Sequence, residues 1–128
     1  MRARDVMAAD VEWIRGEATA FEATERMRAR GISSLLVERR APDDAWGIVT
    51  RTDVVQKVVE PGRDPRGVRV HEIMSKPLVL ISPGLGLRYC AQLMERTGVR
   101  RLPVFDGQEI VGIVTHGDIV RALLASPP

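Results

Sequence analysis

One segment of the sequence occurs twice, and this duplication constrains the fold more than any other feature. The segment Gly47–Asp53, Gly-Ile-Val-Thr-Arg-Thr-Asp, returns as Gly112–Asp118, Gly-Ile-Val-Thr-His-Gly-Asp. Upstream of each copy, Asp5-Val6-Met7 returns as Glu72-Ile73-Met74. The sequence holds two copies and no third. This pattern predicts two similar units that pack face to face, with a cleft between them.

The two copies and the segment between them define the predicted organisation. Residues 1–60 form repeat 1, residues 70–128 form repeat 2, and the linker 61–69 is rich in helix-breaking proline and glycine. Up to Val37 and Val104, corresponding residues of the two copies are separated by 67 positions. Beginning with Gly47 and Gly112 the separation is 65 positions, so copy 1 has two extra residues. We expect these residues in a loop, because loops tolerate changes in length.

Each copy shows the same succession of apolar patterns. A short apolar stretch, a run at helical spacing, two further apolar stretches and a second helical run predict strand–helix–strand–strand–helix. The predicted strands are 11–14, 34–37 and 46–49 in copy 1, and 78–81, 102–105 and 110–114 in copy 2. Gly31 and Gly98 are expected to end the first helix of each copy. The predicted fold class is α/β (α+β), with two small β-α-β-β-α units.

The first helix of each copy has a predicted buried face. Its members are Ala20, Ala23, Thr24 and Met27 in copy 1, and Leu87, Cys90, Ala91 and Met94 in copy 2. Cys90 is therefore interpreted as a small core residue rather than a nucleophile. No histidine or glutamate stands at a spacing that would activate its thiol.

Composition excludes several classes of function. The 19 basic and 17 acidic residues nearly balance, and aromatic residues are only 4%, which argues against a nucleic-acid surface. No activated nucleophile, metal-ligand cluster or acid–base pair is visible, so we expect no enzyme activity, no metal and no required cofactor. No apolar run approaches the ~20 residues that span a bilayer. With no signal peptide visible, we expect a cytoplasmic protein that does not contact membranes.

The repeated Thr-x-x-Asp has two interpretations that the residues alone leave open. Thr50 with Asp53, and Thr115 with Asp118, would each form a helix capping box, which stabilises a helix by about 1 kcal/mol and needs no ligand. Alternatively, the hydroxyl, the carboxylate and the helix N-terminus bind a nucleotide, with the carboxylate on the ribose. The glycine three residues before each threonine lies inside a predicted strand. It indicates close approach by another backbone or by a ligand.

The order of these motifs resembles the CBS (cystathionine-β-synthase) domain family. The pattern Gly-Ile-Val-Thr-x-x-Asp-apolar-apolar occurs twice, and Ser82-Pro83 and the segment Arg100–Val104, Arg-Arg-Leu-Pro-Val, add to it. The resemblance covers about Arg4 to Leu124 and implies a tandem CBS pair, or Bateman module, with pseudo-twofold symmetry. It further implies a regulatory, energy-sensing homodimer that binds AMP, ADP or ATP, with S-adenosylmethionine as an alternative ligand.

Transferred to this chain, the resemblance implies a primary and a weaker secondary site. In the primary site, Asp53 would hold the ribose, while Arg100 and Arg101 would hold the phosphate. The other residues implied in that site are Ile48, Thr50, Pro77, Leu78 and Val79. The secondary site is implied at Ile113, Thr115 and Asp118. There, Ser33 and Ser34 replace the two arginines, so we expect it to bind phosphate less well.

A second function stays open at this stage. The chain would then be a ligand-independent, dimeric interaction module that regulates a partner protein. Its contact surface would be the apolar stripes of the second helix in each copy. These stripes contain Val54, Val55, Val58 and Val59 in copy 1, and Ile119, Val120, Leu123 and Leu124 in copy 2.

Overall fold

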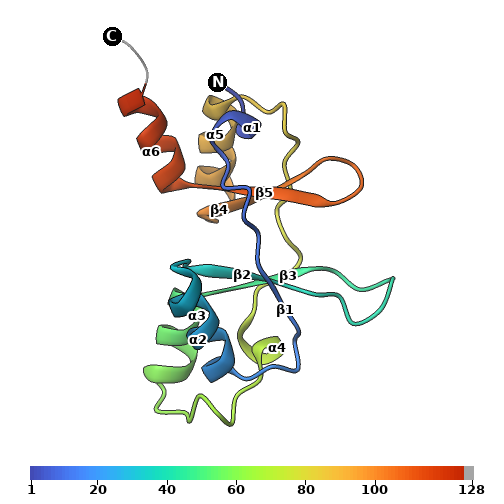
Figure 1. Ribbon diagram of the computed structural model, residues 1–128, viewed down its shortest axis with the longest axis vertical. Helices are drawn as coiled ribbons and strands as arrows, with labels where there is room; N and C mark the ends of the chain where they lie inside the picture. Colours follow the sequence, from blue (N-terminus) through green and yellow to red (C-terminus); the bar gives the residue numbers. More distant parts are fainter. Residues whose placement is uncertain (126–128) are drawn as a thin grey trace. The chain divides into compact units, whose positions relative to one another are not determined.

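The computed structural model describes residues 1–125 and divides them into two compact units (Figure 1). The central unit is Glu12–Leu78, and the terminal unit combines Met1–Val11 with the chain from Val79 onward. The units therefore differ from the sequence repeats, because each repeat gives its first residues to the other repeat's unit. The last three residues of predicted repeat 2, 126–128, lie outside the described residues.

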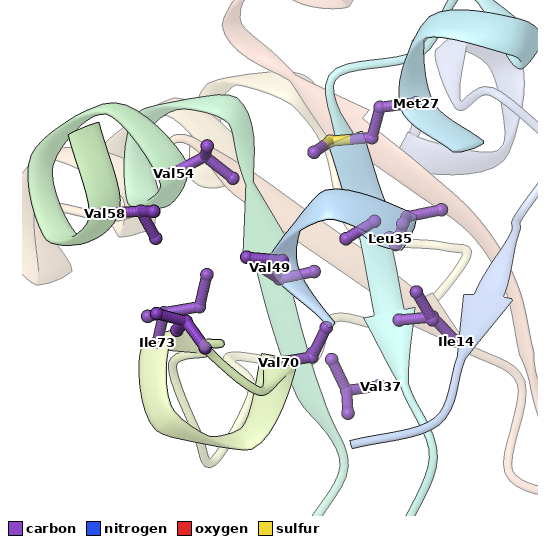
Figure 2. Close-up of a cluster of buried hydrophobic side chains, with 12 residues drawn as sticks. Ile14, Met27, Leu35, Val37, Val49, Val54, Val58, Val70 and Ile73 are labelled. Carbon is purple, nitrogen blue, oxygen red and sulfur yellow. The ribbon is translucent and has the colours of Figure 1, made fainter. Parts of the chain in front are cut away.

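The central unit is a three-stranded sheet with helices on one face (Figure 1). Its strands are β1 (Trp13–Ile14), β2 (Ser34–Val37) and β3 (Gly47–Thr50), with β1 parallel and β3 antiparallel to β2. Its helices are α2 (Ala20–Arg30), α3 (Arg51–Val54), the π-helical turn η1 (Val55–Val59) and α4 (Val70–Ile73). Figure 2 shows Met27, Val54, Val58, Val70 and Ile73 meeting the inward side chains of the sheet.

The terminal unit repeats this plan around a two-stranded antiparallel sheet. Its elements are α1 (Ala3–Val6), α5 (Leu87–Thr97), β4 (Arg101–Phe105), β5 (Ile110–Thr115) and α6 (His116–Ala125). Its core is a separate cluster that contains Ala3, Ile81, Cys90, Met94, Leu102, Val104 and Val114. Burial raises the pKa of the Cys90 thiol, as expected for a core residue. The predicted mixed α/β class is confirmed.

The ends of the first helices follow the sequence closely. Gly31 and Gly98 end α2 and α5 in the left-handed region, with φ of 64° and 76°, so both predicted C-caps are confirmed. The predicted buried face is wrong at Thr24 and Ala91, which are exposed. The Thr24 hydroxyl donates a hydrogen bond to the carbonyl of Ala20 at 2.8 Å, so this polar group has a partner at the helix surface.

The predicted strand 78–81 is wrong, and a single proline explains why. Its counterpart β1 is held in part by the amide of Leu36, which donates to the carbonyl of Glu12 at 2.9 Å. In copy 2 the position of Leu36 is taken by Pro103, which has no N–H to donate to this ladder. Only one isolated bridge remains there, between Ile81 and Val104.

The exchanged segments complete each unit through the backbone of the second hairpin strand. In the central unit, Ile48 and Ser75 exchange two N–H···O bonds of 2.9 Å each. In the terminal unit, Ala8 and Ile113 exchange two such bonds, of 2.9 and 3.0 Å. Each sheet thus gains a short contact from residues that follow the repeated Asp/Glu-x-Met motif.

This packing explains the glycine at the start of each repeated motif. A Cβ at Gly47 would lie 2.8 Å from the sulfur of Met74, and a Cβ at Gly112 would lie 2.5 Å from the sulfur of Met7. The Gly112 Cβ would also lie 3.0 Å from the carbonyl oxygen of Ala8. Of the two causes that the sequence left open for these glycines, the structure shows close approach by another part of the chain.

Candidate functional site

Both Thr-x-x-Asp motifs form capping boxes at a strand-to-helix junction. The Thr50 hydroxyl accepts from the amide of Asp53 at 3.1 Å, and the Asp53 carboxylate accepts from the amide of Thr50 at 2.9 Å. The same pair of bonds joins Thr115 and Asp118, at 3.2 and 2.8 Å. The capping interpretation is therefore confirmed in both copies, and any ligand would meet carboxylates that the backbone already orients.

The two aspartates differ in the cation that pairs with their second oxygen. Asp53 Oδ1 lies 3.1 Å from the ammonium of Lys57, one helical turn later. Asp118 Oδ1 is paired instead with the guanidinium of Arg121, three residues later. Both aspartates are buried, with 9% and 8% of their surface exposed. A charge-assisted hydrogen bond of this kind holds the carboxylate oxygen in a fixed position.

Hydrogen-bonding capacity limits what Asp53 can accept from a ligand. A carboxylate offers about four lone-pair sites. Three are already engaged, by the amide of Thr50, by its hydroxyl at 3.1 Å and by Lys57. A sugar with two adjacent hydroxyls would therefore take the remaining site and share or displace one present donor. The rotatable Thr50 hydroxyl is the donor that can move, because the Lys57 ammonium is also bonded to the carbonyl of Ile73.

The segment that leads to Pro77 and Leu78 is fixed at several points within the central unit. Lys57 donates to the carbonyl of Ile73 at 2.9 Å, and Lys76 pairs with Asp44 at 2.8 Å. The Lys76 ammonium, followed by the amide of Arg40, lowers the pKa of Asp44 to about 2. Asp44 lies in the loop between β2 and β3, so this loop anchors the segment that carries Pro77 and Leu78, the two apolar residues that we call the apolar wall of the predicted site.

The structure divides the residues of the predicted primary site between the two units. Members of the central unit are Ile48, Thr50, Asp53, Pro77 and Leu78, and members of the terminal unit are Val79, Arg100 and Arg101. Within the terminal unit, Arg101 is the cross-strand partner of Thr115, and Pro103 is that of Ile113. In the central unit the equivalent partner of Thr50 is Ser34. The assignment of these residues to a site stays a prediction.

The motif-based interpretation missed Lys57, which pairs with the candidate carboxylate of Asp53. It follows Asp53 by four residues, a spacing at which opposite charges meet on a helix surface. That signal was present in the sequence. What the sequence did not show is that the same ammonium also binds the carbonyl of Ile73, 16 residues away.

The comparison with family models decides the classification. The model of the CBS domain matches residues 3–60 and again residues 70–125. This chain belongs to the CBS domain family. The two matches make it a tandem CBS pair, and the CBS domains of this family are generally non-catalytic regulatory modules.

Relatives and solved structures agree with this classification. The hexameric CBS-CP12 protein from bloom-forming cyanobacteria is 40% identical, with a TM-score of 0.91, and the match covers all of this chain and 75% of that one. Hypoxic response protein 1 of Mycobacterium tuberculosis is 31% identical over 94% of this chain and 84% of its own length. Protein MK0525 of Methanopyrus kandleri is 36% identical over 80% of this chain. The chain spans only about half of that relative, 53%.

Two kinds of feature are absent from the described residues. Across residues 1–125, no helix combines the length and apolar character needed to cross a membrane. The same part of the chain has no group of three or more histidine, cysteine, aspartate or glutamate side chains placed to hold a metal ion.

Proposed function

We propose that this chain is a regulatory module that binds an adenosine nucleotide, AMP, ADP or ATP, through Asp53. The observation that carries the proposal is the geometry of that carboxylate. It is buried, and it is fixed by the backbone amide of Thr50 where a strand gives way to a helix. A fixed carboxylate is suited to accept hydrogen bonds from the adjacent hydroxyls of a ribose.

The two arginines are proposed to supply the charge for the nucleotide's phosphate. Arg100 is exposed and Arg101 is half-buried at the start of β4. A guanidinium within about 4 Å of a phosphate would favour it by about 4 kcal/mol at an effective dielectric constant near 20. In the other copy Ser33 and Ser34 occupy these positions. We therefore propose that the Asp118 site binds phosphate more weakly.

Exposed apolar side chains support self-association as part of the same proposal. Large apolar residues at the surface of the second helices are Val55, Val59, Val120, Leu123 and Leu124. Leu123 and Leu124 are 71% and 84% exposed, which is unusual for two neighbouring leucines on one helix. We propose that they pack against a second copy of the chain to form a homodimer. The hexameric state of the cyanobacterial relative is consistent with self-association.

Thermal unfolding with and without nucleotide tests the proposal. At about 100 times its dissociation constant, a ligand adds roughly 2.7 kcal/mol of stability, or about 10 °C in Tm for a domain of this size. We expect a shift with at least one of AMP, ADP, ATP and S-adenosylmethionine. Asp53→Asn should abolish it, while the matched variant Asp118→Asn should retain most of it. No shift with any of the four, in protein freed of bound ligand, contradicts the proposal.

The exposed leucines also favour a second candidate function. A ligand-independent module would dimerise through them and regulate a partner protein with both sites empty. Mass spectrometry of small molecules released from the purified protein separates the two functions. An adenosine nucleotide supports the sensor, whereas an empty protein that stays dimeric at micromolar concentration supports the interaction module.

A further inference from the structure

We infer that Lys57 is a positioning residue of the Asp53 site, and that it joins the ribose-binding carboxylate to the segment carrying the apolar wall. This inference rests on the proposed function, because it assigns Lys57 a role in nucleotide binding. The charged side chain of Lys57 connects α3–η1 to the end of α4. Its ammonium lies between Asp53 Oδ1, at 3.1 Å, and the carbonyl oxygen of Ile73, at 2.9 Å.

The contacts of Asp53 show why the lysine matters to a ligand. The backbone of Thr50 fixes one carboxylate oxygen, Oδ2, at 2.9 Å. Lys57 fixes the other, so the plane of the carboxylate cannot rotate freely. The side chain of Asp53 is 12% exposed and that of Lys57 is 42% exposed. The ion pair is therefore partly shielded from water, and it is stronger than a fully exposed pair.

The contact with Ile73 extends this effect to the second part of the site. Ile73 is the last residue of α4, and Met74, Ser75 and Lys76 lead from it to Pro77. Ser75 is hydrogen-bonded to Ile48 in both directions. Lys57 therefore sets the distance between the carboxylate and the start of this segment, which carries Pro77 and Leu78.

The other copy of the motif lacks this connection. The residue that corresponds to Lys57 is Ala122, and Arg121 corresponds to Gln56. Arg121 pairs with Asp118 within the same helix. Among residues 1–125 it makes no second hydrogen bond or ion pair to the exchanged N-terminal segment. Lys57 is thus a structural difference between the two sites that is independent of the arginine pair.

A double-mutant cycle on AMP binding tests the role of Lys57. We expect Lys57→Met, which keeps the length of the side chain without its charge, to weaken AMP binding about tenfold. In the Asp53→Asn background, where the weak residual binding is measured at millimolar AMP, the same change should have little further effect, because the carboxylate it positions is gone. Lys57→Arg should restore part of the affinity. Arg121→Met is the matched control, and it should leave the affinity within about twofold of the wild type.

A second probe separates positioning from general damage to the fold. AMP that lacks both ribose hydroxyls, 2′,3′-dideoxy-AMP, cannot use the Asp53 carboxylate. Lys57→Met should leave its weak binding unchanged. Equal loss for AMP and the dideoxy analogue, or fully additive losses for Lys57→Met and Asp53→Asn, would overturn the inference.

Amide hydrogen exchange tests the Lys57 connection separately from the proposed nucleotide binding. If wild-type protein binds neither AMP nor its analogue, the proposed function fails at the Asp53 site. The Lys57 connection is then judged without ligand, from the amides of Ser75 and Leu78. Faster exchange at these amides in Lys57→Met, at an unchanged rate for core amides of β2, supports the connection. Unchanged exchange overturns it.

Discussion

The central and terminal units use the same motif in the same backbone geometry but surround it with different charges. Each has a Thr-x-x-Asp capping box, a strand glycine three residues before the threonine, and an exchanged segment paired with that strand. The central unit adds Lys57 beside Asp53, and Lys76 paired with Asp44. The terminal unit has Arg121 beside Asp118, and it carries Arg101 at the start of β4 with Arg100 directly before it.

This difference shows which parts of the duplicated plan are structural and which are free to diverge. The capping boxes and glycines satisfy backbone groups and packing, so both copies keep them. Charged residues outside the boxes are not needed for that purpose. We therefore propose that these charged residues give the two copies of the motif different ligand preferences.

The largest effect is expected at matched core positions. Leu35 and Leu102 are counterparts, and both are fully buried in their own units. Replacing either by alanine should lower the free energy of unfolding by about 3 kcal/mol, since each removes similar apolar volume from a packed core. Urea denaturation of the two variants measures this. A cost below about 1 kcal/mol for either one would show that its unit is not packed as described.

The next effect concerns the two strand glycines. Gly112→Ala should destabilise by about 2–3 kcal/mol, and Gly47→Ala by about 1–2 kcal/mol, because the added methyl meets closer neighbours at Gly112. Combining Gly112→Ala with Met7→Ala should recover part of the loss by removing the sulfur it meets. Wild-type stability of Gly112→Ala in the same denaturation assay would contradict the close approach of the N-terminal segment.

A smaller effect is expected from the capping hydroxyls. Thr50→Ala and Thr115→Ala should each cost about 1 kcal/mol, because each leaves a helix N–H without its cap. The loss at Thr50 should be the larger, since its hydroxyl also donates to the Asp53 carboxylate at 3.1 Å. Thr→Ser at either position keeps the hydroxyl and serves as the control. Equal stability of the alanine and serine variants would count against the capping boxes.

The smallest effect should appear in the pH dependence of the loop anchor. The pKa of Asp44 is lowered from 3.8 to about 2, chiefly by the hydrogen bond from Lys76. A lowered carboxyl pKa means that the stabilising contribution is present above pH 4 and is lost as the pH falls through about 2. The stability difference between wild type and Asp44→Asn should therefore shrink between pH 4 and pH 2. A difference that does not change over this range would show that the ion pair is absent in solution.

Local features of the fold were predictable because they depend on residues close in sequence. Gly31 and Gly98 marked the helix ends, and the capping boxes followed from a spacing of three residues. The four-residue helices α1 and α4 were not predicted, since one turn shows no periodicity. Their only local signal was an acid three residues after the N-cap, which accepts from the N-cap amide in both cases.

Features that depend on residues far apart in the sequence could not be predicted from its patterns. The loss of strand 78–81 depends on Pro103, which lies more than twenty residues away in the partner strand. The exchange of N-terminal segments depends on which strand each Met-containing motif pairs with, and nothing within the motif specifies this. For the same reason the strand glycines could be explained equally well by a ligand or by another backbone. The hydrogen bond from Lys57 to the carbonyl of Ile73 could not be predicted either, because the two residues are 16 positions apart.

The most direct test of the account is a calorimetric titration of wild-type protein, Asp53→Asn and Asp118→Asn with AMP. The account predicts one tight site per chain in the wild type, lost in Asp53→Asn and retained in Asp118→Asn. Equal loss in both variants, or retention of the tight site in Asp53→Asn, would contradict the assignment of nucleotide binding to the central copy of the motif.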